Sequence, residues 1–229
     1  MKYRRVVSVL LLLAAANARA ATATNSVNET VSAEPRSMTY SLIRNGSRIG
    51  TMRTKLSVAG ESVTVTTQTD IEVKVIIVLY HFTQSTSETW KGDRLVSFTS
   101  QTDDNGTPHK VVVNATSGGM SITADGKMFG ASVRTMPMSF WSTRFLKAKA
   151  LINNDDGGIT NIVTTSLGPE QISVRGSLHQ AQHYKISGGK EFERDLWFER
   201  DQLLRLRLKG SDGSLISSDL DTEAPADQP

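Results

Sequence analysis

The sequence predicts a mainly β protein: one curved antiparallel sheet, an open barrel or a sandwich of roughly ten to twelve strands, with a single short helix around residues 139–152. Two observations predict the strands. Apolar or β-branched residues alternate with polar ones over long stretches. Glycine preceded by Asn or Asp recurs at hairpin spacing between them. The helix depends on a third observation, an aromatic-rich stretch in which the alternation stops.

The longest alternation begins at Ser62. Its apolar or β-branched positions are Val63, Val65, Thr67, Thr69, Ile71, Val73, Val75 and Ile77. One face of such a strand covers a core while the other meets water. The run exceeds an ordinary strand in length, which predicts a strand bent around a curved sheet. The alternation breaks over residues 76–79, and Tyr80, Phe82 and Trp90 are even-numbered, so we expect a bulge or tight turn there.

The stretch TMPMSFWSTRFLKAK (residues 135–149) interrupts this pattern. Trp141, Phe145, Ala148 and Ile152 are spaced i, i+4, i+7 and i+11, which predicts one apolar helix face. A curved sheet has a concave apolar face that such a helix can cover. The pattern leaves two interpretations open, a helix that closes the core and a movable lid over an apolar ligand.

Both ends of the chain differ from the middle. Basic residues precede the apolar run at 6–16, and Ala18-Arg19-Ala20 forms a cleavage site, which predicts a signal peptide over residues 1–20. We therefore expect a periplasmic or secreted protein after cleavage near Ala20. Residues 21–36 and 221–229 are small and polar, which predicts a flexible leader and a disordered tail around a single β domain at 37–220.

Composition excludes several classes of protein. Of the 26 Lys and Arg residues, four lie in the predicted signal peptide, which leaves 22 against 23 Asp and Glu. This balance lacks the basic excess of a nucleic-acid-binding protein. The chain has no cysteine, so its stability rests on a core rather than on disulfides. No second apolar run is long enough to span a membrane.

No catalytic residue, metal site or cofactor is predicted. His179 and His183 stand four residues apart, but their flanks predict a strand, which separates them by about 13 Å, too far to share one ion. We therefore expect exposed strand histidines. The chain contains no G-x-S-x-G motif and no cysteine nucleophile. Basic residues Arg205, Arg207 and Lys209 alternate with leucines, a pattern that is typical of a solvated strand face. It is weak evidence for a face that contacts anionic lipid or polysaccharide.

Four motifs carry a resemblance to a known family. They are YHFTQSTSETW (80–90), GDRLVSFTSQTDDNG (92–106), PMSFW (137–141) and DLWFERDQLLRLRLKG (195–210). In this order they resemble an exported bacterial family catalogued only as a domain of unknown function, over residues 37–220. This family usually has Ser-Tyr-Trp-Asn where Ser139-Phe140-Trp141-Ser142 stands here. The layout is more distantly similar to the half-open β-barrels of LolA-like lipoprotein carriers, a resemblance that implies fold alone.

Three functions follow as hypotheses. The first is a non-catalytic module that binds or carries a lipid or other apolar molecule in the concave face. Its candidate residues are Met136, Met138, Phe140, Trp141, Phe145, Tyr80, Phe82, Glu88 and Trp90. The second is a structural component of the cell envelope that binds a partner protein. Peripheral membrane contact is compatible with both of these hypotheses. The third and least supported is a hydrolase. Glu88 shares a strand face with Trp90, so it either pairs with Arg94 or another basic residue, or lines a cavity.

Overall fold

Residues 35–75, 78–189, 192–210 and 212–225 are described by the computed structural model, and they form sixteen strands and one 3-10 helix. Thirteen strands make one antiparallel sheet, and three short strands make a second sheet. The prediction of a mainly β protein with a large antiparallel sheet is confirmed. The strand count in these ranges exceeds the expected ten to twelve, because several strands of three to five residues are too short to show alternation.

The large sheet consists of β1 (Arg36–Arg44), β2 (Ser47–Ala59), β3 (Ser62–Val75), β4 (Val78–Lys91), β5 (Arg94–Asp104), β6 (Thr107–Ala115), β7 (Met120–Ala124), β8 (Lys127–Ala131), β12 (Val163–Val174), β13 (Ser177–Gly188), β14 (Phe192–Glu199), β15 (Gln202–Lys209) and β16 (Leu215–Pro225). The small sheet consists of β9 (Thr135–Pro137), β10 (Ala150–Ile152) and β11 (Ile159–Asn161). The 3-10 helix η1 spans Thr143–Lys147.

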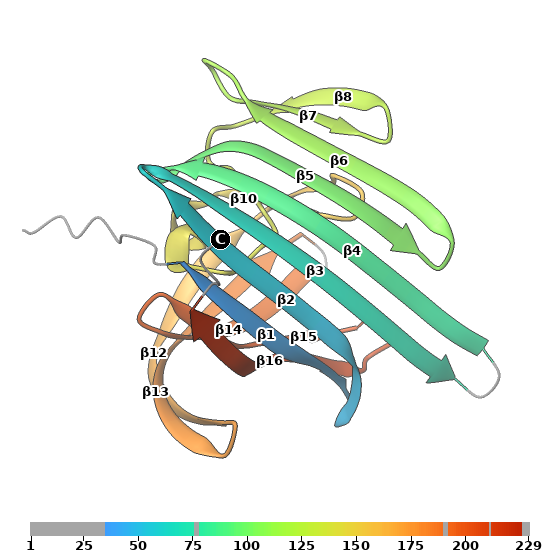
Figure 1. Cartoon of the computed structure of the whole chain (residues 1–229), viewed down its shortest axis with the longest axis vertical. Coiled ribbons are helices and arrows are strands. Elements are labelled where there is room, and N and C mark those ends of the chain that lie inside the picture. The colour runs from blue at the N-terminus through green and yellow to red at the C-terminus, as the bar shows by residue number, and fades with distance from the viewer. Residues whose placement is uncertain (1–34, 76–77, 190–191, 211, 226–229) are drawn as a thin grey trace, which may run out of the picture. The chain divides into compact units, whose positions relative to one another are not determined.

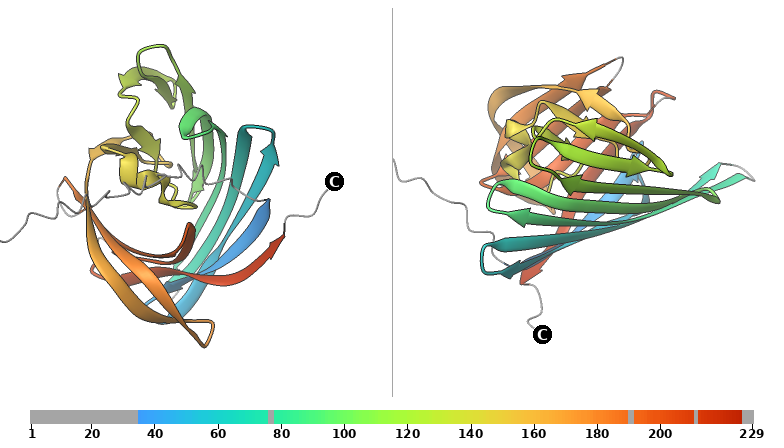
Figure 2. Two further views of the ribbon diagram at one scale, coloured as in Figure 1. Left: turned by 90° about the vertical axis from the view of Figure 1, so that its left-hand side faces the viewer. Right: turned by 90° about the horizontal axis from the view of Figure 1, so that it is seen from above.

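The large sheet is built from two meanders (Figure 1). Strands β1 to β8 follow one another across one part of it, and β12 to β16 across the other. The first strand and the last strand pair with each other and join the meanders. The sheet curves strongly, and β8 and β12 are its two edges (Figure 2). The sequence predicted either an open barrel or a sandwich. The large sheet is a single curved sheet that does not close, which corresponds to the first of these.

Tight turns join neighbouring strands of the first meander. Asn45-Gly46, Asn105-Gly106 and Asp125-Gly126 each have positive φ at both residues, from 46° to 89°. Asn, Asp and Gly adopt this conformation at little cost, and it matches the right-handed twist of the flanking strands. The Asn-Gly and Asp-Gly pairs in the sequence therefore mark real hairpins.

The predicted alternation is visible in burial. Val63 and Val65 on β3 are buried, whereas Thr64 and Thr66, which alternate with them, are not. On β4 the even-numbered side chains face the same way, since Glu88 and Trp90 are both buried. The expected break at 76–79 includes residues 76 and 77, which lie outside the described ranges, but Val75 and Val78 pair at the end of the hairpin.

The prediction of a single helix around 139–152 is wrong. Trp141, Phe145, Ala148 and Ile152 are all buried as the spacing predicted, but only the five residues of η1 are helical, and that helix is of the 3-10 type. The backbone bonds elsewhere instead, because β9 and β10 pair in parallel and bring the two ends of this stretch together. A short segment rich in aromatic and hydroxyl residues has little intrinsic helical stability, so this sheet pairing prevails.

Residues 132–162, here called the inserted segment, connect the two edge strands of the large sheet. They include β9, η1, β10 and β11 and lie on its concave side (Figure 2). No helix among the described residues is long and apolar enough to cross a membrane.

The β domain begins and ends at other residues than the sequence predicted. Strand β16 continues to Pro225, so residues 221–225, expected in a disordered tail, are strand. Arg36, expected in the leader, opens β1 and pairs with Pro225. Each of these strand ends depends on a partner nearly 190 positions away along the chain, which no local pattern reveals. The predicted signal peptide and residues 21–34 lie outside the described ranges.

Candidate ligand-binding site

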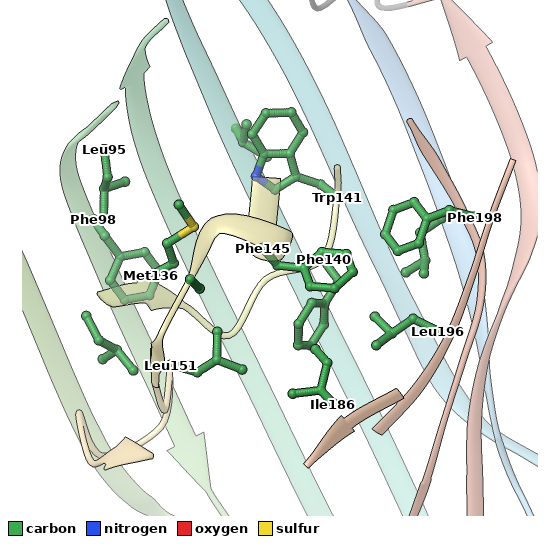
Figure 3. Packing of buried hydrophobic residues seen from close by; sticks show 14 of the residues in the cluster. Leu95, Phe98, Met136, Phe140, Trp141, Phe145, Leu151, Ile186, Leu196 and Phe198 are labelled. Atoms are coloured by element: carbon green, nitrogen blue, oxygen red, sulfur yellow. The ribbon is translucent and has the colours of Figure 1, made fainter. Parts of the chain in front are cut away.

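The inserted segment fills one half of the concave face with aromatic side chains (Figure 3). Phe145 is 2% exposed and is the centre of this packing. Its ring lies edge-on to Phe140 at 5.6 Å and to Tyr184 at 5.9 Å between centroids, and tilted against Phe198 at 5.4 Å. Such aromatic pairs add about 0.5–1.5 kcal/mol each beyond the area they bury. This half of the concave face is therefore a packed core and offers no room to a ligand.

A buried carboxylate joins the inserted segment to the sheet. Glu88 on β4 is 0% exposed, and its Oε2 accepts hydrogen bonds from Trp90 Nε1 at 2.7 Å and from Trp141 Nε1 at 3.2 Å. The two indole rings meet edge to face at 6.1 Å. Its other oxygen, Oε1, accepts no hydrogen bond of normal geometry from the described residues. One carboxylate oxygen thus serves two tryptophans, one from the sheet and one from the inserted segment.

Burial raises the pKa of the Glu88 carboxyl. The nearby Ser139 hydroxyl, the two indole N–H groups and the positive charge of Arg144 act against that rise. The expected ion pair with Arg94 is wrong, because the Arg94 guanidinium donates to the Thr116 carbonyl oxygen at 3.0 Å. No ion pair of Glu88 with another basic residue is found among the described residues, although the charge of Arg144 acts on its pKa. Glu88 also does not line the cavity described below. Its carboxylate accepts hydrogen bonds from the two indoles instead.

Polar contacts at the ends of η1 hold the inserted segment in place. Asp201 Oδ1 accepts from the Thr143 backbone N–H at 2.7 Å and from its hydroxyl at 2.6 Å. Asp93 forms ion pairs with Arg144 and Lys147. The Arg144 guanidinium also lies 4.7 Å above the Trp141 ring, a cation–π contact. The Asp201 contacts satisfy the first turn of η1, whereas the Asp93–Lys147 pair is exposed on both sides and contributes little.

The other half of the concave face is open and holds an apolar cavity of about 300 Å³, here called the trough. Its apolar lining consists of Leu42, Ile49, Met52, Ile71, Met138, Phe140, Trp141, Leu203, Leu206, Leu208 and Ile216. Hydroxyl, amide and guanidinium groups complete it, from Tyr40, Thr54, Thr67, Thr69, Gln84, Thr86, Ser139, Asn154, Arg194 and Ser218. Binding pockets for small molecules are concave and mostly apolar, and the smallest enclose roughly this volume.

The trough exists because the strands are longer than the segment that covers them. Along β3 the inward side chains are fully buried at Val63 and Val65 but half-buried at Thr67, Thr69 and Ile71. The same alternation continues across this change, so the strand does not alter its conformation there. What changes is the covering, which ends near Met138 and Trp141. Apolar side chains beyond that point face a cavity instead of protein.

The structure divides the predicted ligand-binding residues into three groups. Met138, Phe140 and Trp141 line the trough. Met136, Phe145, Glu88 and Trp90 lie in the packed half and do not line it. Tyr80 and Phe82 are half-buried near the far end of β4, outside the trough.

Tyr80 has surroundings of its own. Burial, a hydrogen bond to Asp104 and the negative charges of Asp104 and Asp155 raise the pKa of its hydroxyl to about 12. Its ring therefore carries a neutral hydroxyl at physiological pH, beside carboxylates and away from the apolar trough.

Most of the trough lining is absent from the predicted set. The missed aliphatic residues come from strands β1, β2, β3, β15 and β16 and are Leu42, Ile49, Met52, Ile71, Leu203, Leu206, Leu208 and Ile216. The alternation in β3 and β15 identifies Ile71 and Leu206 as inward-facing. The pairing of β1 with β16, which brings these strands to one cavity, has no signal in the sequence.

The histidines of β13 form part of a polar cluster on the opposite, convex face. His183 stacks on Trp197 at 4.3 Å between ring centroids, and its two ring nitrogens each lie 2.9 Å from a carboxylate oxygen, of Glu170 and of Asp195. His179 lies 3.4 Å from a carboxylate oxygen on the neighbouring strand. Both are strand residues as predicted, but they are half-buried rather than exposed. No three His, Asp or Glu side chains in the described ranges gather as a metal site.

The basic row of β15 is partly neutralised. Arg205 forms a two-point ion pair with Asp219, at 2.9 Å and 2.6 Å. Arg207 lies 5.4 Å above the Trp197 ring, and Lys209 is exposed. Two of the three cations therefore have no carboxylate contact among the described residues, and they border a polar groove of about 990 Å³.

Comparison with known proteins identifies the family without adding an activity. No curated protein matches the sequence. A family described as a domain of unknown function (DUF6134) matches residues 40–221, which include every residue that lines the trough and the inserted segment itself. The chain therefore belongs to this family.

Proposed function

We propose that this protein is an exported, non-catalytic binding protein that holds or carries a lipophilic ligand in the trough. The observation that carries the proposal is the row of half-buried aliphatic side chains, among them Ile49, Ile71 and Leu208, that face a cavity of about 300 Å³. Each Å² of apolar surface removed from water is worth about 25 cal/mol, so an apolar molecule gains by filling this cavity.

Two further features support this proposal. A signal peptide is predicted at residues 1–20, and it supports a location in the periplasm or outside the cell. The packed half of the concave face fixes one wall of the trough, because Trp141 both lines the cavity and donates to the buried Glu88. A largely preformed cavity of this kind does not require the protein to rearrange before a ligand enters.

The proposal is tested with the neutral fluorescent probe N-phenyl-1-naphthylamine. Wild-type protein is expected to bind it at one site, and dodecanol is expected to displace it. Ile71→Arg places a charge in the trough and should weaken binding at least tenfold. Val96→Arg is the matched control, because Val96 is a β-branched residue, 39% exposed, that does not line the trough. A wild-type protein that binds no probe, or equal loss in both variants, would refute the proposal.

A second candidate function is supported by the sheet edges. Met128 on edge strand β8 is 75% exposed, and Val163 on edge strand β12 is 65% exposed. An edge strand with exposed apolar side chains can pair with a strand of another protein. A role as an interaction component of the cell envelope therefore remains as the alternative. Crosslinking from position 128 in cells should then recover one specific partner, and recovery of none would exclude this edge.

A further inference from the structure

A positively charged side chain lines the apolar trough. Arg194 lies on β14 between the inward-facing residues Phe192 and Leu196, and it pairs in register with Ile186 of β13. Leu196 and Ile186 are both 0% exposed, which identifies the inner face of the sheet here. Arg194 is itself half-buried and lines the trough. A guanidinium on the inner face of a sheet is costly unless something compensates its charge.

The described residues supply little compensation. Arg194 Nη1 donates to the backbone carbonyl oxygen of Glu193 at 2.8 Å, and the guanidinium carbon lies 4.4 Å from the centre of the Phe192 ring. No carboxylate among the described residues forms an ion pair with it. The Glu193 carboxylate lies on the opposite face, 3.6 Å from Lys185 Nζ. Burial lowers the pKa of Arg194, as expected of a cation that has lost water without gaining an anion.

Arg194 also lies at a boundary between two environments. Besides the apolar trough it lines a second groove, and most residues of that groove, such as Lys185 and Asp195, lie on the convex face. The groove contains three more cations, Lys185, Arg207 and Lys209, together with the acidic Glu193 and Asp195. Arg194 is the one charged side chain among the described residues that line the trough, so the aliphatic lining meets a guanidinium there.

We propose that the ligand of the trough is a single-chain amphiphile whose anionic head group, a carboxylate or a phosphate, is bound by Arg194 while its apolar chain lies in the trough. This inference rests on the proposed function. The planar guanidinium presents paired N–H donors that match the oxygens of either head group. A neutral lipid would leave the Arg194 charge uncompensated, and a cationic one would be repelled.

The test compares ligands that share one chain and differ in the head group. Dodecanoate, dodecyl phosphate, dodecanol and dodecyltrimethylammonium each displace the neutral probe from wild-type protein, Arg194→Gln and Arg53→Gln. Arg53 is the matched control, because it is exposed on the outer face of β2 and its replacement changes the net charge equally. Wild type is expected to bind an anionic ligand at least tenfold more tightly than dodecanol, and dodecyltrimethylammonium most weakly.

In Arg194→Gln the preference for the anion should disappear while the affinity for dodecanol stays unchanged; Arg53→Gln should behave as wild type. Preference for dodecanoate or for dodecyl phosphate identifies the head group. Equal binding of dodecanol and both anions by wild type would overturn the inference and leave the proposed function intact. Loss of the preference in both variants would also overturn it, since the effect would then be one of net charge. A protein that binds neither probe nor dodecanol refutes both proposals.

Discussion

The two halves of the concave face share strand β3 and differ in what covers it. In the filled half Phe145, Trp141 and Phe140 from the inserted segment pack against the sheet, and Val63 and Val65 of β3 are buried. In the open half the same strand presents Thr67, Thr69 and Ile71 to a cavity. The comparison shows that the cavity forms because the strands extend beyond the inserted segment that covers them. The conformation of β3 does not change between the two halves.

This comparison also separates stability from binding. Residues at the centre of the filled half, such as Phe145, hold the fold together and have no access to a ligand. The half-buried residues of the open half, such as Ile71, can be replaced at lower cost to the fold. Phe140 and Trp141 lie at the border, since both line the trough and Trp141 also donates to Glu88.

The largest expected effect is on stability in the filled half. Phe145→Ala removes the centre of the aromatic cluster and should lower the free energy of unfolding by about 3–5 kcal/mol. Ile71→Ala in the open half should cost less than about 1.5 kcal/mol, because its side chain is already partly in water. Urea unfolding of both variants measures the difference. Equal losses of stability in the two variants would show that the two halves are packed alike, and would contradict the distinction between a filled half and an open half.

A smaller loss is expected where the two halves meet. Glu88→Ala leaves two buried indole N–H groups without an acceptor, which costs about 1–3 kcal/mol for each. The variant also removes the desolvation cost of the buried carboxyl, which offsets part of this loss, so the free energy of unfolding should fall by roughly 2–4 kcal/mol. Glu88→Gln keeps an acceptor oxygen and is the control, with a smaller loss at neutral pH. If the two variants were equally unstable, the hydrogen bonds to Trp90 and Trp141 would not be the reason for the loss.

Ligand binding should stabilise the protein only through the open half. A ligand at one hundred times its dissociation constant adds about 2.7 kcal/mol to the free energy of unfolding. Dodecanoate is therefore expected to raise the midpoint of thermal unfolding of wild type. It should have almost no effect on Ile71→Arg and its full effect on Val96→Arg. A shift of the same size in all three proteins would indicate binding elsewhere.

The last expected effect is a dependence on pH that belongs to Glu88. Burial raises its pKa above the ordinary value of 4.5, so the folded state binds more protons than the unfolded state between the two values. Stability therefore falls as pH rises through that window and is highest below it. Relative to Glu88→Gln, which has no proton to lose there, wild type should become less stable with rising pH. A stability difference that does not change with pH would contradict the raised pKa.

Much of the filled half could be predicted from the sequence, for local reasons. The even-numbered parity of β4 places Glu88 and Trp90 on one face, and the aromatic stretch around Trp141 and Phe145 marks the segment that covers it. The conformation of that stretch could not be predicted, because its apolar spacing fits a helix while its backbone bonds are decided by the parallel pairing of β9 with β10.

The trough could not be predicted, and the reason is long-range pairing. Ile49, Ile71 and Leu208 share one cavity only because β16 pairs with β1, strands that lie at opposite ends of the domain. Arg194 shows the same limit: the sequence places it between Phe192 and Leu196, but only the register of β13 to β15 brings it to the trough. Alternation tells which face a side chain occupies and does not tell which cavity that face encloses.

The pairing of β1 with β16 also bears on how the chain acquires its fold. The first and last strands of the domain lie in the middle of the sheet, so each meander can form from local hairpins but the two can join only once the final strand is present. Pairing of distant strands is slow compared with hairpin formation. A chain that emerges during synthesis with its N-terminus first would therefore wait with β1 unpaired on one side until β16 emerges. During that interval the edge of β1 is the part of the molecule most open to a chaperone or to aggregation.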